Sequence, residues 1–507
     1  MSVERHGRRK IAGVAAIQQS EWSQPKRQIA PTRILSDDHV EAIHLKSLQV
    51  LQDIGMDVLL PEARDILQNA GALVSDDRVR IGRDIVEAAM KTPPSEFTFH
   101  ARNPARNVQF GGDWLIFGPV GGPPNCSDLD RGRRSGNLED NANFLKLSQF
   151  FNCIHTSGDG CVDAMDYPVS VRQLHVMHNK LRYSDKVPFI YSTTRPVLMD
   201  SLEMVRLARG VSHQEMLEQP SAYTVINTNS PLKLDSPMSI GIIEMARMNQ
   251  ICVATPFTLA GAMAPITLAG ALVQQNAEVL GCLALSQLTR PGAPFVYGSF
   301  TSNVDMKSGA PAFGTPEYMK ATIAGGQLAR RYGLPYRTSS ANAANALDAQ
   351  AAYETVFSLW AAIMGGGNLI VHAAGWLEGG LVASFEKFAL DVELLQMVAE
   401  FLKPIVVDED SMGLDAMLEV GPGGHFFGAQ HTLSRYATEF YQPLISDWRN
   451  YNQWVEAGSP QVPEKANALW KAALAEYRAP WMDPAQAADL DAFFYRRLAE
   501  GGQPTDF

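Results

Sequence analysis

The sequence is poor in cysteine, in excess positive charge and in long apolar runs. Its five cysteines in 507 residues form no Cys-x-x-Cys pair, so we expect reduced, buried side chains in a cytoplasmic protein. The 43 basic and 54 acidic residues leave a net charge of −11, which argues against a nucleic-acid or anionic membrane partner. No apolar run reaches the about 18 residues that could span a bilayer. Small molecules and other proteins remain as partners.

The N-terminus offers two interpretations. The start "MSVERHGRRKIAGVAAIQQSEW" places Arg8 and Arg9 ahead of the apolar stretch "IAGVAAI", which is the layout of a twin-arginine export signal. That stretch is short, and no small-residue cleavage site follows it. We therefore expect residues 1–30 to form a flexible arm.

Helix start and stop residues organise the next 80 residues. Ser36 is a candidate N-cap with two aspartates after it, and Gly55 would end that helix. A second helix should begin at Pro61 and end before Gly71. With the strand and helix of "VRIGRDIVEAAM", these patterns predict a small, mostly helical layer over residues 31–110.

From residue 111 onward, short β-rich runs alternate with longer helical patterns. Eight such runs occur: "WLIFGPVGG", "FNCIHTSGDG", "PFIYSTTRP", "AYTVINTNSP", "ICVATPFTLAGA", "PFVYGSFTS", "LPYRTSS" and "NLIVHAAGW". Eight strand–helix units predict an α/β fold, a (β/α)₈ TIM barrel over residues 111–400. An open doubly wound sheet is the alternative, although no Gly-x-Gly-x-x-Gly follows the first run. Residues 401–507 should form a helical C-terminal extension packed on the barrel.

In a barrel of this kind the active site lies at the carboxyl ends of the strands. The residues at or just after those ends are Phe117, Asp159, Tyr191, Asn227, Asn229, Gly261, Tyr297, Phe300, Asn303, Arg337, Thr338, His372, Trp376 and Glu378. Only Asp159, His372 and Glu378 among them could act as acid or base. The set is otherwise aromatic and amide-rich.

Several aromatic rings near one barrel mouth would suit a quaternary ammonium group, whose charge is stabilised by ring faces. The alternative is that each ring belongs to the barrel core. Arg337 could pair with a substrate carboxylate in bidentate fashion, or it could form a salt bridge within the barrel.

Metal and phosphate sites have little support. His175 and His178 lie three residues apart, with Cys161 upstream, but a solvated helix face explains the pair more simply than zinc. His425 and His431 lie in a Gly-rich stretch that is typical of turns. The "GGG" of residues 365–367 lacks the lysine of a phosphate loop. We expect it to form the end of a helix before a buried strand. We predict no metal.

Three stretches carry a family likeness: "GTPEYMKATIAGGQLARRYGLPYR" with "ALDAQAAYET", "GGLVASFEKFALDVELL", and "GPGGHFFGAQHTL" continuing to "EFYQPLISDW". Through them the chain, from about residue 33 to its end, resembles the trimethylamine:corrinoid methyltransferase superfamily, in the branch without pyrrolysine that includes glycine betaine enzymes. The resemblance implies a (β/α)₈ barrel, a homo-oligomer, and methyl transfer from an amine to cob(I)alamin on a separate corrinoid protein. No Asp-x-His-x-x-Gly is present, so no tightly bound cofactor is expected.

The likeness has one departure that bears on the substrate. The pyrrolysine of the trimethylamine enzymes is expected in the loop after "LPYR", and here that loop is the small and polar "TSSANAAN". A quaternary amine needs no protonation before its methyl leaves, because nitrogen departs as a neutral amine. We expect this loop to leave room for glycine betaine, proline betaine or carnitine.

The expected substrate-binding residues follow from the strand ends. They are Phe117, Asn227, Asn229, Tyr297, Phe300, Tyr336, Arg337, Thr338, His372 and Trp376. Two other functions stay open: a barrel that binds quaternary amines as a sensor or store, and an acid–base lyase that uses Asp159, His372 or Glu378.

Overall fold

The computed structural model describes residues 17–158 and 160–504. Arg8, Arg9 and Asp159 therefore lie outside the described residues. At the centre is a six-stranded parallel sheet in the order β6-β17-β16-β13-β11-β9. Its strands are β6 (Ile116–Phe117), β9 (Tyr223–Ile226), β11 (Ile251–Ala254), β13 (Phe295–Gly298), β16 (Tyr336–Ser339) and β17 (Leu369–Val371).

Two extended segments continue this sheet beyond its edges. Phe189 forms an isolated parallel bridge with Tyr223 of β9, and Thr156 forms another with Val187. On the far side, the His155 amide donates to the Phe117 carbonyl of β6 at 2.8 Å. Each of the eight predicted runs thus supplies either a central strand or one of these bridged segments.

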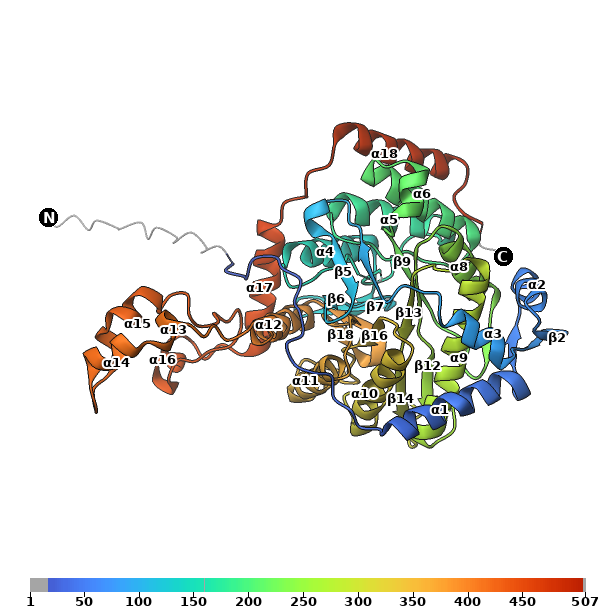
Figure 1. Cartoon of the computed structure of the whole chain (residues 1–507). Helices are drawn as coiled ribbons and strands as arrows, with labels where there is room; N and C mark the ends of the chain where they lie inside the picture. Colours follow the sequence, from blue (N-terminus) through green and yellow to red (C-terminus); the bar gives the residue numbers. More distant parts are fainter. Residues whose placement is uncertain (1–16, 159, 505–507) are drawn as a thin grey trace.

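Helices follow the strands and pack on the outside of the sheet (Figure 1). They are α4 (Leu138–Phe150), α5 (Val169–Tyr183), α6 (Arg195–Arg209), α7 (His213–Glu218), α8 (Ser236–Arg247), α9 (Leu268–Thr289), α10 (Pro316–Arg331), α11 (Ala349–Met364) and α12 (Phe385–Phe401). Helix α9 is long and apolar enough to cross a membrane by length and composition, yet 78% of its most apolar stretch is buried inside the protein.

Side chains alternate between the two faces of the central strands. Ile116, Val253, Val296 and Leu369 point to the inner side and form one core with Phe99. Their chain neighbours Phe117, Cys252, Tyr297 and Ile370 point outward, as does Tyr336 of β16, and these side chains pack into cores shared with the helices. Both faces are therefore apolar, as is usual for parallel strands covered on both sides.

Short strands extend the carboxyl ends of the central ones, which the sequence patterns did not predict. One small sheet consists of β12 (Phe257–Ala260), β14 (Phe300–Val304) and β15 (Pro311–Ala312). A second consists of β18 (Trp376–Leu377), β19 (Val382–Ser384), β7 (Asn125–Asp128) and β8 (Gly132–Ser135).

The N-terminal layer begins and ends its helices where expected. Ser36 caps α1 (Asp37–Gln49), which continues as a π-helical turn (Val50–Ile54) to Gly55. Helices α2 (Pro61–Asn69) and α3 (Arg83–Ala89) follow. The layer is less helical than predicted, because it also contains β1 (Met56–Val58), β2 (Leu73–Ser75), β3 (Arg78–Arg80), β4 (Glu96–Phe99) and β5 (Val108–Gly111).

The described part of the expected flexible arm, residues 17–30, is held against the body. Lys26 forms an antiparallel bridge with Trp114, and the buried Arg27 pairs with Asp113 at 2.6 Å. These backbone and charge contacts correct the prediction of a flexible segment for this part of the chain.

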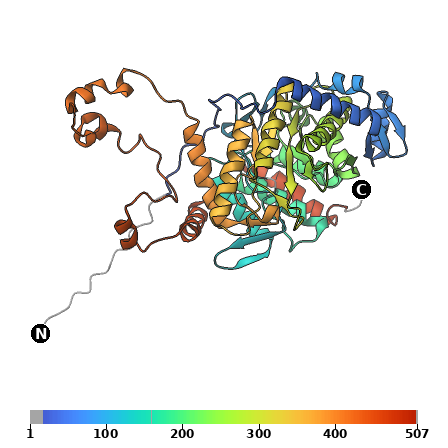
Figure 2. The ribbon, with the colours of Figure 1, turned by 90° about the horizontal axis from the view of Figure 1, so that it is seen from below.

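The C-terminal extension has two parts that behave differently. Helix α17 (Val462–Glu476) packs on α12 and α4, and α18 (Pro484–Ala499) packs on α5 and α6. Between α12 and α17, the chain carries α13 (Glu409–Met412), α14 (Leu414–Val420), α15 (Gln430–Arg435) and α16 (Tyr451–Glu456), which stand away from the body in two perpendicular views (Figures 1 and 2).

Candidate active site

A cavity of about 700 Å³ opens at the carboxyl ends of the central strands. Its lining combines strand ends with the loops and short strands that follow them. The lining residues include Phe189, Tyr191, Thr224, Asn227, Thr228, Asn229, Ser230, Met238, Phe257, Met263, Phe300, Arg337, His372, Trp376 and Gly379 to Leu381. Six of the ten predicted binding residues are among them: Asn227, Asn229, Phe300, Arg337, His372 and Trp376.

One wall of the cavity is aromatic. The rings of His372 and Trp376 have centroids 4.0 Å apart, and Phe300 lies 5.6 Å from His372 and 6.2 Å from Trp376. Phe257 adds a fourth ring 5.1 Å from Phe300. Ring faces and edges at these spacings form a continuous apolar, polarisable surface, which can stabilise a cation without a carboxylate.

Trp376 is held in place from behind by the loop between β16 and α11. Its indole Nε1 donates to the Asn342 carbonyl at 3.0 Å, and the Asn342 side-chain amide donates to the Trp376 carbonyl at 2.8 Å. A Cβ on Gly380, whose φ is +102°, would lie 2.5 Å from the Trp376 ring, so only glycine fits at this point of the rim.

The loop "TSSANAAN" therefore has a different place from the one expected. Ser340, Ala341, Asn342 and Ala344 are buried, and no residue from 338 to 345 is among the described lining residues. The small side chains let the loop pack closely behind Trp376 and do not themselves open the cavity.

Arg337 brings a positive charge to the cavity wall. It is 2% exposed, and the carbon of its guanidinium lies 5.5 Å from the centroid of the Phe300 ring. A guanidinium offers a planar fork of donors to a carboxylate. A cation-stabilising wall and a carboxylate-binding group thus lie side by side.

His372 has an unusual backbone and an unusual ring. Its φ of +57° places it in the left-handed region, where non-glycine residues are uncommon. Burial, and then the neighbouring Arg337 charge, hold the pKa of this imidazole well below its usual range. At neutral pH the ring is uncharged, so His372 contributes an aromatic face and a neutral polar group rather than a proton donor.

The hydroxyls of the polar wall of the cavity are held by one buried carboxylate. Glu278 of α9 accepts hydrogen bonds from the Thr228 hydroxyl, from the Ser230 hydroxyl at 2.7 Å and from the Leu232 amide at 2.9 Å. Four residues of this loop, Asn227 to Ser230, line the cavity. Glu278 therefore sets the shape of the polar wall without lining it.

The other four predicted residues lie outside the cavity lining, and strand alternation explains all of them. The Tyr297 hydroxyl donates to Asn276 of α9 at 2.9 Å, and the Tyr336 hydroxyl donates to the Thr322 carbonyl of α10 at 2.7 Å. Phe117 packs in the outer core. A Cβ on Gly367 would meet the Thr338 methyl group at 2.9 Å. All four belong to outward-facing strand positions.

Two further candidates also lie away from the cavity lining. Glu378 is paired with Arg133, whose Nε lies 3.1 Å from both carboxylate oxygens. The Asn303 side chain accepts a hydrogen bond from Thr315 at 3.4 Å. Of the three acid–base candidates, His372 is neutral, Glu378 faces Arg133, and Asp159 lies outside the described residues.

The histidines weighed as zinc ligands have structural contacts. His178 Nε2 lies 2.7 Å from the Asp491 carboxylate of α18, and its ring stacks on Phe494 at 4.4 Å. His175 also contacts Phe494, at 5.0 Å. The predicted solvated helix face is therefore wrong, because α18 covers it. Within residues 17–158 and 160–504, no group of three or more His, Cys, Asp or Glu could hold a metal.

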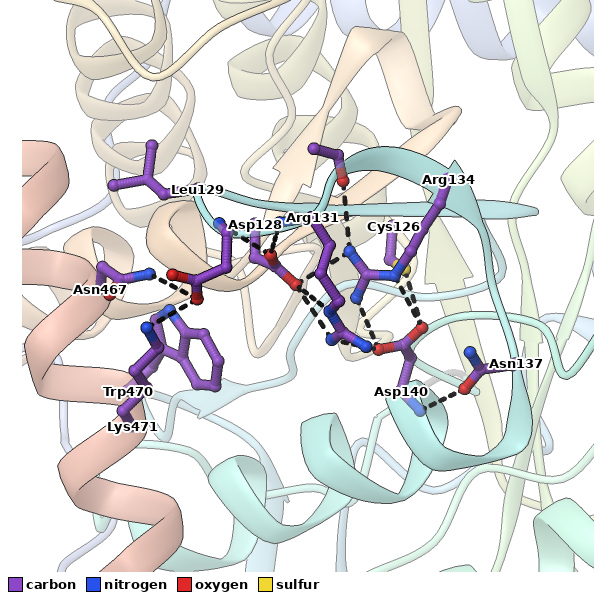
Figure 3. A network of polar contacts seen from close by, with 12 residues as sticks. Cys126, Asp128, Leu129, Arg131, Arg134, Asn137, Asp140, Asn467, Trp470 and Lys471 are labelled. Carbon is purple, nitrogen blue, oxygen red and sulfur yellow. Dashed lines mark hydrogen bonds and ion pairs between the residues drawn. The ribbon is translucent and has the colours of Figure 1, made fainter.

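A charged network outside the cavity joins residues 128–134 to Asp140 (Figure 3). Arg131 and Arg134 each pair with both Asp128 and Asp140 at 2.7 to 3.0 Å. The two carboxylates are fully buried, and Asp140 belongs to α4. The network fixes the β7–β8 hairpin on α4.

The fixed hairpin in turn positions the rim segment of residues 378–381. Arg133 of β8 binds Glu378, and the Asn125 side chain of β7 donates to the Leu381 carbonyl at 3.1 Å. Leu381 lines the cavity and is 55% exposed, so the mouth reaches the surface here. Met263 lines the mouth as well and is exposed. The rim is thus rigid and partly apolar.

Pattern reasoning missed several lining residues, notably Phe189, Phe257, Met263 and the segment Gly379 to Leu381. Phe257 follows Pro256 within the run "ICVATPFTLAGA", where a second short strand begins after the first. That Pro was the available signal for an extension strand.

Comparisons with known proteins identify the family of this chain. The family model described as trimethylamine methyltransferase (MTTB) matches residues 2–502. A glycine betaine methyltransferase of Desulfitobacterium hafniense (strain Y51) is 36% identical over 471 residues, 93% of this chain and 98% of that protein. A trimethylamine methyltransferase MttB of D. hafniense (strain DSM 10664 / DCB-2) is 30% identical over 441 residues, 85% and 87% of the two chains.

Among solved structures, the monomethylamine methyltransferase MtmB of Methanosarcina barkeri is a distant match, with a TM-score of 0.45 and 10% identity over 90% of this chain and 97% of that one. The family resemblance found in the sequence is confirmed by the match along nearly the whole length. The chain belongs to the trimethylamine methyltransferase (MTTB) family.

Proposed function

We propose that this protein is a methyltransferase that moves a methyl group from a quaternary amine of the glycine betaine type to cob(I)alamin on a separate corrinoid protein. The observation that carries the proposal is the pairing of an aromatic wall with a guanidinium: Phe300 lies next to His372, Trp376 and Arg337. Glycine betaine carries a trimethylammonium and a carboxylate, and this wall offers a partner for each.

The relatives support the same assignment. The relative that is 36% identical is named a glycine betaine methyltransferase, and it aligns with nearly all of both chains. Proline betaine and carnitine share the same two charged groups, so they belong to the same substrate class.

The chain's own residues act by holding and orienting the substrate. The aromatic wall binds the ammonium, Arg337 binds the carboxylate, and the loop of Asn227 to Ser230 closes the polar side. Orientation of the methyl toward the mouth and exclusion of water lower the barrier without a proton transfer. The amine leaves uncharged, so a neutral His372 is compatible with turnover.

The corrinoid supplies the nucleophilic cobalt when its carrier protein docks. The residues at the mouth fit such an arrangement. Met263 and Leu381 are exposed there, and a Cβ on Gly261 would lie 3.2 Å from the Met306 sulfur and 3.8 Å from Ile266. An apolar rim of this kind suits a macrocycle or a protein face better than bulk solvent.

We also infer a closed (β/α)₈ barrel, in which the two bridged segments complete the ring between β9 and β6. The His155–Phe117 hydrogen bond supports this closure. A cytoplasmic location is supported by five buried cysteines, all free. A homo-oligomer is part of the same proposal.

The test uses the purified full-length chain with cob(I)alamin and one methylated amine at a time. We expect glycine betaine to convert the cob(I)alamin absorbance to that of methylcobalamin, and trimethylamine to give little conversion. The same reactions with a corrinoid protein of the host cover the case in which free corrinoid cannot replace the carrier.

The outcomes separate the three functions. Saturable binding of glycine betaine without any methylcobalamin, with free and carrier-bound corrinoid alike, would leave a sensor or store. Turnover of another substrate with a bell-shaped pH dependence that Asp159→Asn abolishes would indicate a lyase.

A further inference from the structure

Residues 404–458, which we call the projecting segment, have no core of their own. Their helices α13 to α16 are only four to seven residues long. Only Ala416, Ala429 and Ile445 are buried in these 55 residues. The segment is coloured orange in Figures 1 and 2 and stands apart from the rest of the chain in both views.

Attachment to the body depends on one carboxylate and on Ile445, which is 3% exposed and belongs to an apolar core of the body. Glu393 of α12 accepts hydrogen bonds from the Tyr441 hydroxyl at 2.9 Å and from the Leu444 and Ser446 amides at 2.6 and 3.2 Å. The remainder of the segment, residues 405–440 and 447–458, is therefore positioned without a packed apolar interface to its own body.

The projecting segment is nevertheless rich in exposed apolar side chains. Fifteen of the 34 exposed large hydrophobic residues in the described chain lie within it. They are Ile405, Val406, Val407, Met412, Leu414, Met417, Leu418, Phe426, Phe427, Leu433, Tyr436, Phe440, Trp448, Tyr451 and Val455. Ile405 is 90% and Phe427 84% exposed, and exposure on this scale marks a surface that is covered in the working protein.

A second apolar surface lies on the body where the segment begins. On α11, Tyr353 and Phe357 are exposed, and they share one helix face with Trp360 because of their spacing. On α12, Met397 and Phe401 are exposed, and Phe401 meets Trp360 with ring centroids 5.0 Å apart. We call these five side chains the α11–α12 stripe. A surface helix would ordinarily present polar residues here.

We propose that two copies of the chain exchange their projecting segments, so that each segment covers the α11–α12 stripe of the other copy. One chain carries both surfaces, and its own segment begins at Pro404, three residues after Phe401 of the stripe. In a twofold exchange, the partner's segment arrives where the chain's own segment departs, and the two contacts are identical by symmetry.

The size and character of the surfaces favour a permanent partner. A stable interface uses about 20 to 30 residues a side, and obligate interfaces are the more apolar ones. If a carrier protein that binds and leaves during turnover were the partner, the fifteen large apolar side chains of the projecting segment would be exposed to water between encounters. A second copy is present at the same concentration at all times. Neither surface contains a residue that lines the cavity, so exchange leaves the mouth accessible.

The experiment measures the mass of the full-length chain in solution by sedimentation. One variant carries Phe427→Glu and Phe440→Glu in the segment, and another carries Phe357→Lys and Phe401→Lys in the stripe. A control carries Leu73→Glu and Trp481→Glu, whose side chains are also exposed but lie elsewhere. We expect the chain and the control to self-associate, and each test variant to have a dissociation constant at least about 100-fold higher.

A mixture of the two test variants then tests whether the projecting segment contacts the α11–α12 stripe. In a mixed dimer, the acidic segment of one copy meets the basic stripe of the other, and the second contact is unchanged. We expect the mixture to associate at least about 10-fold more tightly than either variant alone. Circular dichroism verifies that each variant is folded.

Three results would overturn the proposal. They are a monomer at every concentration of the unaltered chain, self-association that both charged variants leave unchanged, and a mixture of folded variants that does not recover association.

Discussion

Different side chains on the cavity wall recognise the positive and the negative group of the ligand. The rings contact whatever cation enters, whereas Arg337 can recognise only an anionic group. This division makes the effect of a substitution depend on the ligand, which a purely structural role would not do.

Trp376 should contribute to the binding of every quaternary amine. We expect Trp376→Leu to weaken glycine betaine and choline alike by about 30-fold, because a desolvated cation–π contact is worth about 2 kcal/mol. Calorimetric titration measures both affinities. The matched control is Tyr297→Phe, which removes a hydroxyl bonded to Asn276 on the outer side of the strand and should leave both unchanged.

Arg337 should discriminate between ligands with and without a carboxylate. We expect Arg337→Gln to weaken glycine betaine by about 10- to 100-fold, the value of a charge-assisted hydrogen-bonded pair, while choline binds as before. Equal losses for both ligands in a titration would mean that Arg337 shapes the wall and does not touch the carboxylate.

The β9–α8 loop illustrates how an element outside the cavity controls the wall. Its residues Asn227 to Ser230 line the site, but their conformation depends on Glu278 in the middle of α9. A carboxylate can accept from four donors, and here it accepts from Thr228, Ser230, Leu232 and Gln274.

The variant Glu278→Gln places one amide NH₂ against these donors and so loses at least one hydrogen bond. We expect it to lower the free energy of unfolding by about 1 to 3 kcal/mol and to weaken every ligand by a similar factor. Urea unfolding and titration measure the two effects. Gln274→Ala is the comparison variant: it removes one donor to Glu278 together with a hydrogen bond to the Met263 carbonyl, leaves the other three donors to Glu278 in place, and should change ligand affinity by less than about threefold. Unaltered binding in a folded Glu278→Gln protein would disprove the link between α9 and the polar wall.

The molecule as a whole should lose stability in mild acid, because it buries histidines in the neutral form. Burial lowers the pKa of His155 to about 3 and that of His44 to about 4. His155 Nδ1 accepts from the Phe117 amide at 3.0 Å, which requires an unprotonated nitrogen.

The sign of the pH dependence follows from the two pKa values of each histidine. Between about pH 6.5 and the folded pKa, the unfolded chain binds the proton and the folded chain does not, so stability falls as pH decreases through this window. From pH 7 to pH 5, each of these two groups should cost about 2 kcal/mol.

Urea unfolding of the chain and of His155→Gln at both pH values tests this account. The variant should lose about 2 kcal/mol less between pH 7 and pH 5 than the unaltered chain does. Phe117→Leu, in the core beside His155, should be destabilised equally at both. An identical pH dependence for the chain and His155→Gln would contradict the assignment.

Much of the architecture can be predicted from local sequence patterns. Caps and breakers such as Ser36, Gly55 and Pro61 determine helix ends through a few neighbouring atoms. The eight β-rich runs repeat a unit whose connections have few alternatives. Six of ten binding candidates lie on the cavity because strand ends converge at one edge of the sheet.

What required the tertiary structure was the direction of each side chain. Both faces of each parallel strand are buried here, so apolar residues occupy both faces. The sequence of a strand therefore does not show which of its alternating side chains point inward. Tyr297 and Arg337 occupy neighbouring strands, yet the Tyr297 hydroxyl contacts α9 on the outer side, whereas the Arg337 side chain lines the cavity. The extension strands that bring Phe257 to the site, and the departure of residues 404–458 from the body, depend on contacts between distant segments. The local sequence alone determined the central strands and the main helices, and long-range packing decided the extension strands and which side chains form the site.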